Sequence, residues 1–220
     1  MNEAIGGVLP AAVAVALSPI PIVAVIVMLG TPRARRNGPA FAVAWVIGLS
    51  VVMAAVLLVF GGGNTSDAAD TSVRWGTFGL GVLMLWLAVR QWRKRPPKGQ
   101  DVELPGWVTH VDEFTWVKSF ASGVVLSAVN PKNLALTLAA SGAIATSGLD
   151  GADKTLAAAA FVAIASSSVI GLVAVALVAP RATAAPLSAI RQYMARNSSV
   201  IMAVILLLLG AKLIGDALGG

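Results

Sequence analysis

The 220-residue sequence lacks cysteine, has few charged residues and contains a single histidine. Without cysteine, the chain can form no disulfide, no thiolate nucleophile and no cysteine-based metal site. Charged residues make up 12% of the chain and hydrophobic residues 57%. Soluble domains carry about 25% charged and about 45–50% apolar residues. The composition therefore excludes an ordinary soluble domain and is typical of a chain whose surface faces lipid.

Further absences narrow the function. The chain has no Gly-x-x-x-x-Gly-Lys-Ser/Thr motif, so we expect no nucleotide-driven pump. Its apolar runs contain no paired acids, histidine or cysteine, and the only histidine, His110, lies between them. We therefore expect no enzyme, no cofactor and no metal site. The net charge of +6 comes from basic residues in short loops, which is typical of membrane orientation and argues against a nucleic-acid partner.

Six apolar stretches are each long enough to cross a membrane as a helix, which takes about 20 residues for about 30 Å of hydrocarbon. They cover about residues 4–29, 39–61, 73–92, 119–147, 154–179 and 198–217. Each must be helical, because an open strand would leave backbone groups unpaired in lipid. The sequence predicts an all-α, polytopic membrane protein with six transmembrane helices.

The basic residues are distributed asymmetrically between the loops. The 16 Lys and Arg lie in the first, third and fifth loops, with four exceptions: Arg74, Lys132, Lys154 and Lys212. Short basic loops stay on the cytoplasmic side. We therefore expect both termini to lie outside and the middle loop to lie inside.

The middle loop divides the chain into a first three-helix repeat over 1–92, a cytoplasmic linker over 93–118 and a second three-helix repeat over 119–220. Because three is odd, the second set must cross the membrane in the opposite direction, which predicts an inverted repeat. Residues 93–99 are basic and proline-rich, as in an extended linker. Apolar side chains recur every third residue within 107–120 and predict an amphipathic helix on the membrane surface; the alternative is a loop with interfacial anchors.

Each predicted repeat opens with a helix that proline interrupts. The first helix contains the sequence LSPIP at 17–21, and the fourth contains LSAVNP at 126–131. Proline removes a backbone N–H, and freed carbonyls survive in a bilayer only where they line protein or a watery cavity. One such break can be a structural kink, but paired breaks are the best sequence indication of a transporter site. The candidate substrate-binding residues are Ser18, Pro19, Pro21, Ser127, Asn130, Pro131, Lys132 and Asn133.

Lys132 is the most informative candidate, because it lies near the centre of an apolar stretch. Burying its charge costs at least about 2.5–3.5 kcal/mol on insertion scales, and the acids nearest the predicted spans, Asp216 among them, lie at their outer ends or in the middle loop. Lys132 must then be neutral, face water, bind carbonyls freed by the prolines, or await an anion. We expect it to face a cavity and attract an anionic headgroup or carboxylate. The alternatives are a lysine that snorkels to an interface and a role coupled to protonation.

Other small and polar residues in the apolar stretches have less specific interpretations. Asn130 and Asn133 can share one side of a helix and donate to substrate oxygens or to broken backbone. Serines 166–168 are more typical of helix packing than of a site. Glycines at 76, 79 and 81 are expected to permit close helix contact.

The second half resembles the peptidoglycolipid-addressing family, which includes the GAP and sulfolipid-addressing proteins. The resemblance is carried by LPGW at 104–107, Asp112 and VNPKNL at 129–134, and the SPIP sequence at 18–21 also fits. That family is similar in turn to the lysine-exporter superfamily of small six-helix carriers. The resemblance implies a multi-pass protein of the bacterial plasma membrane that helps to export glycolipids towards the cell envelope.

We therefore expect a transporter or export-assisting protein for a polar or anionic amphiphile of the glycolipid or peptidoglycolipid class. The alternatives are an exporter of small solutes such as amino acids, and a non-transporting scaffold for a separate lipid-export machine. Cation export is disfavoured, because the spans offer neither carboxylates nor thiolates. The expected partners are the amphiphile, membrane lipids, and either a second copy of the chain or lipid-export machinery.

Overall fold

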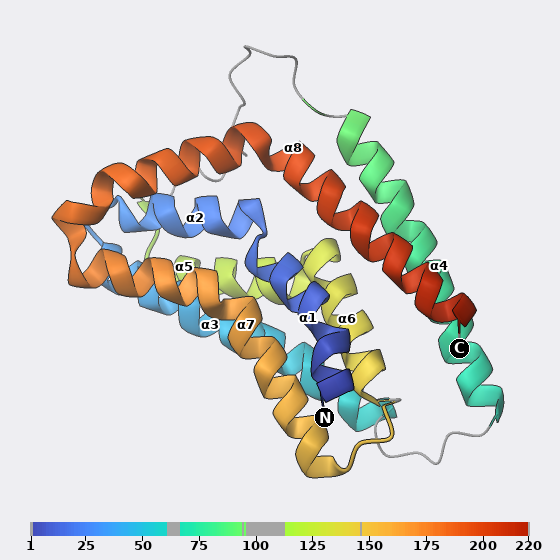
Figure 1. Ribbon diagram of the computed structural model, residues 1–220. Coiled ribbons are helices and arrows are strands. Elements are labelled where there is room, and N and C mark those ends of the chain that lie inside the picture. The colour runs from blue at the N-terminus through green and yellow to red at the C-terminus, as the bar shows by residue number, and fades with distance from the viewer. Residues whose placement is uncertain (1, 61–66, 94, 96–112, 146, 220) are drawn as a thin grey trace.

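The computed structural model describes residues 2–60, 67–93, 95, 113–145 and 147–219, and within them every extended element is a helix (Figure 1). The helices are α1 (Asn2–Ala16), α2 (Pro19–Leu29), α3 (Ala34–Phe60), α4 (Asp67–Arg93), α5 (Trp116–Val124), the π-helical turn η2 (Val125–Val129), α6 (Pro131–Ala145), α7 (Gly151–Val178) and α8 (Pro180–Gly219). The predicted all-α class is confirmed.

Three of these helices, α3, α7 and α8, are long and apolar enough to cross a membrane. The pair α1 and α2 meets the same criterion together, across a bend of 47°. Four of the six predicted spans are thus supported within the described residues. The spans predicted over 73–92 and 119–147 remain predictions, as does the inverted repeat.

Both predicted helix breaks are present. The first stretch divides where α1 ends at Ala16 and α2 begins at Pro19. The fourth divides into α5, η2 and α6, with Pro131 as the first residue of α6. The prolines cause both divisions, because their nitrogens cannot donate to the preceding turn.

Two boundaries differ from the prediction. The segment 180–197, expected to be a loop because it contains three arginines, is the first part of the 40-residue α8. Arginine, alanine and leucine are strong helix formers, so charge alone was a poor guide there. The amphipathic helix predicted over 107–120 lies partly outside the described residues; in the described part, the α-helix begins only at Trp116, after the N-cap Thr115.

Helix α4 lies along the second half of α8, on one side of the other helices (Figure 1). Two glycines face each other at this contact. A Cβ added at Gly81 would lie 3.1 Å from the Gly210 carbonyl oxygen, and one at Gly210 would lie 2.9 Å from the Gly81 oxygen. The predicted packing role is confirmed for Gly81, whereas Gly76 and Gly79 have nothing within 4 Å of an added Cβ.

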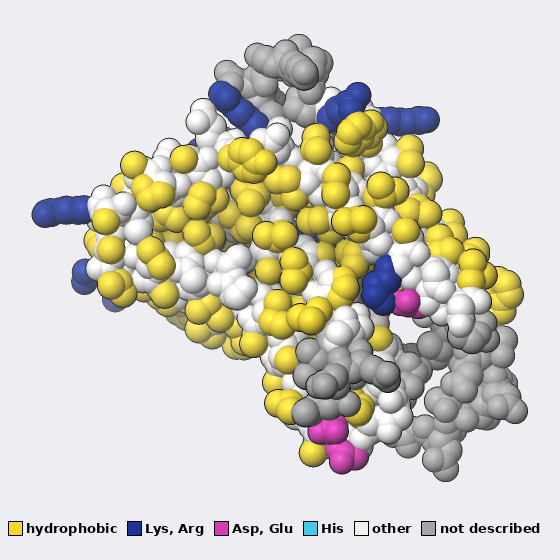
Figure 2. Space-filling view, in the orientation of Figure 1, with side chains coloured by type: hydrophobic (Ala, Val, Ile, Leu, Met, Phe, Trp, Pro, Cys, Tyr) yellow, Lys and Arg dark blue, Asp and Glu magenta, His cyan; other side chains and the backbone are white. Residues whose placement is uncertain are grey.

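The remaining helices surround an apolar core. Its largest fully buried side chains include Phe41 and Trp45 of α3, Met28 of α2 and Phe161 of α7. On the face shown in Figure 2, most Lys and Arg side chains project at the top and the left of the view, whereas the Asp and Glu side chains lie at the bottom and, beside one basic side chain, right of centre. This separation agrees with the charge asymmetry in the sequence; the orientation of the termini stays a prediction.

Candidate functional site

The break between α1 and α2 takes the helical donors away from the Ala14 and Ala16 carbonyls. In a continuous helix the Ser18 N–H would donate to Ala14, but here it donates to Val15 at 3.1 Å. The Ala14 oxygen therefore has no helical donor. The Ala16 oxygen loses its donor as well, because the chain bends before residue 20. Both carbonyls need donors from elsewhere, since buried backbone oxygens are rarely left unpaired.

Lys132, from the first turn of α6, supplies one of these donors. Its Nζ donates to the Ala14 carbonyl at 2.8 Å and to the Ser18 Oγ at 2.9 Å. The side chain is only 5% exposed, and no carboxylate among the described residues contacts its ammonium. The contact is favourable, because the last turn of α1 presents the negative end of the helix dipole.

Ser168 of α7 supplies the second donor. Its Oγ donates to the Ala16 carbonyl at 2.6 Å. The two freed carbonyls of the first half thus accept hydrogen bonds from two helices of the second half.

The second break is completed by its own residues. The Asn130 N–H donates to Val125 at 2.9 Å, and Pro131 has no N–H to offer to Leu126. The Leu126 oxygen instead accepts from the Asn133 Nδ2 at 2.8 Å. Asn130 acts as the N-cap of α6, because its Oδ1 accepts from the Lys132 N–H at 3.1 Å. Pro131 follows at the first helical position, where a missing N–H has no consequence.

A buried polar row continues from the breaks along α6. Ser18 Oγ lies 3.4 Å from the Asn133 Oδ1 and is placed to donate to it. Thr137 Oγ1 then donates to the Asn133 carbonyl at 2.8 Å, and Ser141 Oγ donates to the Thr137 carbonyl at 2.6 Å. Ser141 Oγ also lies 3.0 Å from the Met53 sulfur on α3. The row therefore connects the broken helices to α3.

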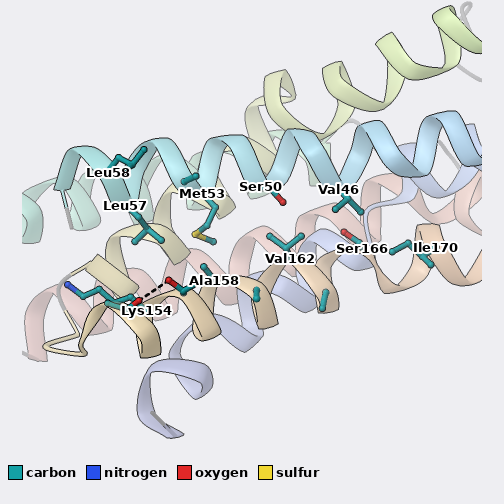
Figure 3. A pocket seen from close by; sticks show the side chains of 15 residues that line it. Val46, Ser50, Met53, Leu57, Leu58, Lys154, Ala158, Val162, Ser166 and Ile170 are labelled. Carbon is teal, nitrogen blue, oxygen red and sulfur yellow. Dashed lines mark hydrogen bonds between the residues drawn. The ribbon is translucent and has the colours of Figure 1, made fainter. Parts of the chain in front are cut away.

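A groove of about 780 Å³ lies between α3 and α7 (Figure 3). Its walls are mostly aliphatic, with Lys154 near one end and Ser166 and Ile170 towards the other. Met53 forms part of its wall, and the Ser166 hydroxyl is buried beside it. Lys132 does not line this groove.

The structure brings part of the predicted site together. Ser18, Lys132 and Asn133 are in contact across the two breaks, and the buried Pro19 and Pro21 begin the adjacent α2. Asn130 and Pro131 lie at the beginning of α6, as its N-cap and its first residue. These outcomes leave the substrate-binding role of the eight predicted residues as a prediction.

Two observations bear on these side chains. Lys132 is 5% exposed and its ammonium binds a carbonyl freed by the first break, which is one of the environments that the sequence left open; its attraction of an anion stays a prediction. Ser127 packs on α3, where its Oγ would clash with a Cβ added at Gly48, and its part in substrate binding stays a prediction. The polar row of Thr137 and Ser141 was not predicted, although Asn133, Thr137 and Ser141 follow one another at intervals of four residues, which indicates a shared helix face. Ser168 was interpreted as packing, and only the position of Ala16 shows what it binds.

The family model for Sap, sulfolipid-1-addressing protein, matches residues 8–219. No curated protein and no solved structure matches the chain.

Proposed function

The chain belongs to the sulfolipid-1-addressing protein family, and from this premise we propose that it moves, or helps to move, an anionic or polar amphiphile of the glycolipid class across the bacterial plasma membrane. Family membership supports a role in lipid export or addressing. The likeness to the lysine-exporter superfamily, and six spans with both termini outside, are parts of this proposal.

One observation carries the proposal: a buried ammonium joins the two halves and is held by neutral oxygens alone. Lys132 contacts Ala14 and Ser18, and no described carboxylate neutralises it. Charged side chains within a membrane protein usually mark a substrate or ion pathway. A sulfate, phosphate or carboxylate would bind this ammonium more strongly than the present neutral partners, because it adds the attraction between two opposite charges to the hydrogen bond.

The contacts suggest how binding would lead to movement. Ala14 and Ser18 belong to the first half of the chain, and Lys132 belongs to the second. An arriving anion competes with the Ala14 carbonyl for the ammonium and so weakens the contact between the halves. Rocking of one half against the other would then carry the anion from one side of the membrane to the other, as in transporters with broken helices.

The first prediction is that Lys132→Ala abolishes most transport. The purified protein in phosphatidylcholine vesicles would be given a fluorescent sulfated glycolipid, and its movement followed by the access of a membrane-impermeant quencher. We expect a rate lower by roughly tenfold or more, because a hydrogen bond to a charged group contributes about 1.5–3 kcal/mol.

Lys212→Ala is the matched control. Lys212 is a partly exposed lysine of α8 that pairs with Asp216, so its removal should leave the rate unchanged. A correctly inserted Lys132→Ala protein that moves the lipid at the wild-type rate would contradict the proposed site. A wild-type protein that moves no lipid in pure vesicles would contradict a self-contained carrier and favour an assisting role.

A further inference from the structure

The groove between α3 and α7 has the length of a lipid chain. Its lining extends from Gly151 to Ile170 on α7, or about 28 Å at 1.5 Å per residue. On α3 it extends from Val46 to Leu58, or about 18 Å. One leaflet contributes about 15 Å of hydrocarbon, half of the bilayer core. A chain with its headgroup at the membrane surface therefore fits along the groove.

The composition of the walls matches an acyl chain. Most lining residues are aliphatic, among them Leu57 and Val162 on opposite walls. The volume of about 780 Å³ lies in the range of built ligand pockets, which is about 300–1,000 Å³.

The groove also holds a buried polar atom that has no hydrogen-bond partner among the described residues. Ser166 is fully buried, and its Oγ has no hydrogen-bond partner among the described atoms. Ser167 and Ser168, its neighbours on α7, both donate to carbonyls. A buried hydroxyl without a partner needs an explanation, and an acceptor oxygen carried by a bound molecule supplies one.

Charge distinguishes one end of the groove. Lys154 lines it there (Figure 3), and the next residue, Thr155, lines the groove as well. Two acids lie nearby without lining the groove: Asp150, whose Oδ1 caps the Asp153 N–H at 2.8 Å, and Asp153 itself. The cation is thus the charged group that a headgroup entering this end would meet.

We propose that the groove is a binding site for an anionic lipid, with its headgroup at Lys154, its acyl chain between α3 and α7, and an oxygen substituent of that chain at Ser166, about 18 Å further along α7. This assignment rests on the proposed function in one respect, namely that the transported molecule is a lipid. It adds a second site, separate from the helix breaks, that holds the apolar part of the molecule.

The experiment is photolabelling of the full chain in phosphatidylcholine vesicles that contain a trace of phosphatidylglycerol with a diazirine in its acyl chain. Labelled peptides are located by mass spectrometry. We expect adducts concentrated in 46–58 and 151–170, and more of them than with the phosphatidylcholine that carries the same chain.

Substitutions test the position of the acyl chain and the position of the headgroup separately. Ala159 and Ala163 line the groove and are exposed to it, so Ala159→Phe with Ala163→Phe should fill it and remove most groove adducts. Ala163→Phe alone is the milder variant if the double variant does not fold. Ala174→Phe, at an exposed position of α7 outside the groove, is the matched control and should keep the labelling. Lys154→Gln should remove the preference for phosphatidylglycerol over phosphatidylcholine.

Several results would overturn the assignment. Adducts spread evenly over α4, α7 and α8 would show ordinary boundary lipid, and so would groove adducts that survive both phenylalanine variants. An undiminished preference for phosphatidylglycerol in Lys154→Gln would overturn the headgroup position. Absence of groove adducts in a protein that is found to be a dimer in the same vesicles would make a second copy the occupant. Because labelling needs no transport, Lys132→Ala should lose transport and keep the groove adducts, so failures of the two proposals are distinguishable.

Discussion

The two helix breaks begin alike and are completed differently. In each, a polar residue precedes a proline that starts a helix: Ser18 before α2 and Asn130 before α6. Asn130 uses its side chain locally, to accept from the Lys132 N–H. Ser18 makes no side-chain cap to its own helix, and its hydroxyl contacts Lys132 and Asn133 of the other half.

The freed carbonyls show the same difference. The Leu126 oxygen accepts from Asn133, seven residues further along the chain. The Ala14 and Ala16 oxygens accept from residues 118 and 152 positions away. The second break is therefore complete within one segment and could keep its shape in the proposed movement of the halves. The first break depends on contacts between the halves, so it is the one that the proposed movement would disturb.

The second break packs against α3, and we expect the larger of two losses of stability there. Gly48→Ala places a methyl group against the Ser127 Oγ and lowers the free energy of unfolding by about 1–3 kcal/mol, the usual cost of overpacking. Reversible unfolding in lipid–detergent micelles measures this loss.

Ser127→Ala in the same chain should recover part of the stability, because it removes the nearest atom and leaves the Ser127 Cβ at 3.2 Å. A Gly48→Ala protein as stable as the wild type would mean that the second break packs loosely against α3. The difference that we infer between the two breaks would then be wrong.

A smaller effect is expected at the first break. Ser168→Ala leaves the Ala16 carbonyl without its donor and should lower the free energy of unfolding by about 0.6–1.7 kcal/mol, the range measured for hydrogen bonds between membrane helices. Ser167→Ala is the control, because the exposed Ser167 donates to Ile164 of its own helix. Equal unfolding free energies for the two variants would show that Ser168 does not hold the first break.

The sequence was sufficient for the helical class, the family and the position of both breaks. Long apolar runs and prolines act locally, so their consequences can be deduced from neighbouring residues. The partners of the freed carbonyls could not be deduced in this way. Nothing near Ala16 in the sequence indicates Ser168, because only the packing of α1 against α7 brings them together.

Lys132 shows most clearly which contacts the sequence alone cannot predict. The sequence indicated that its charge has no acid near the centre of the spans, and this left several environments open. The structure selects the freed carbonyl, because α1 and α6 pack side by side at the break. The groove between α3 and α7 was not predicted, since alanine, valine and leucine on two helices give no sign of which faces remain apart.

The contrast between the two breaks can be measured at the corresponding serines of the two Leu-Ser motifs. Ser18 is 3% exposed and Ser127 is fully buried, and the chain has no cysteine, so Ser18→Cys and Ser127→Cys each provide one reactive thiol. Alkylation by a water-soluble maleimide would be followed in vesicles, with and without the sulfated glycolipid. We predict that the lipid accelerates alkylation of Ser18→Cys and leaves Ser127→Cys unreactive. Equal acceleration at both positions, or none at Ser18→Cys in a protein that transports, would contradict the account.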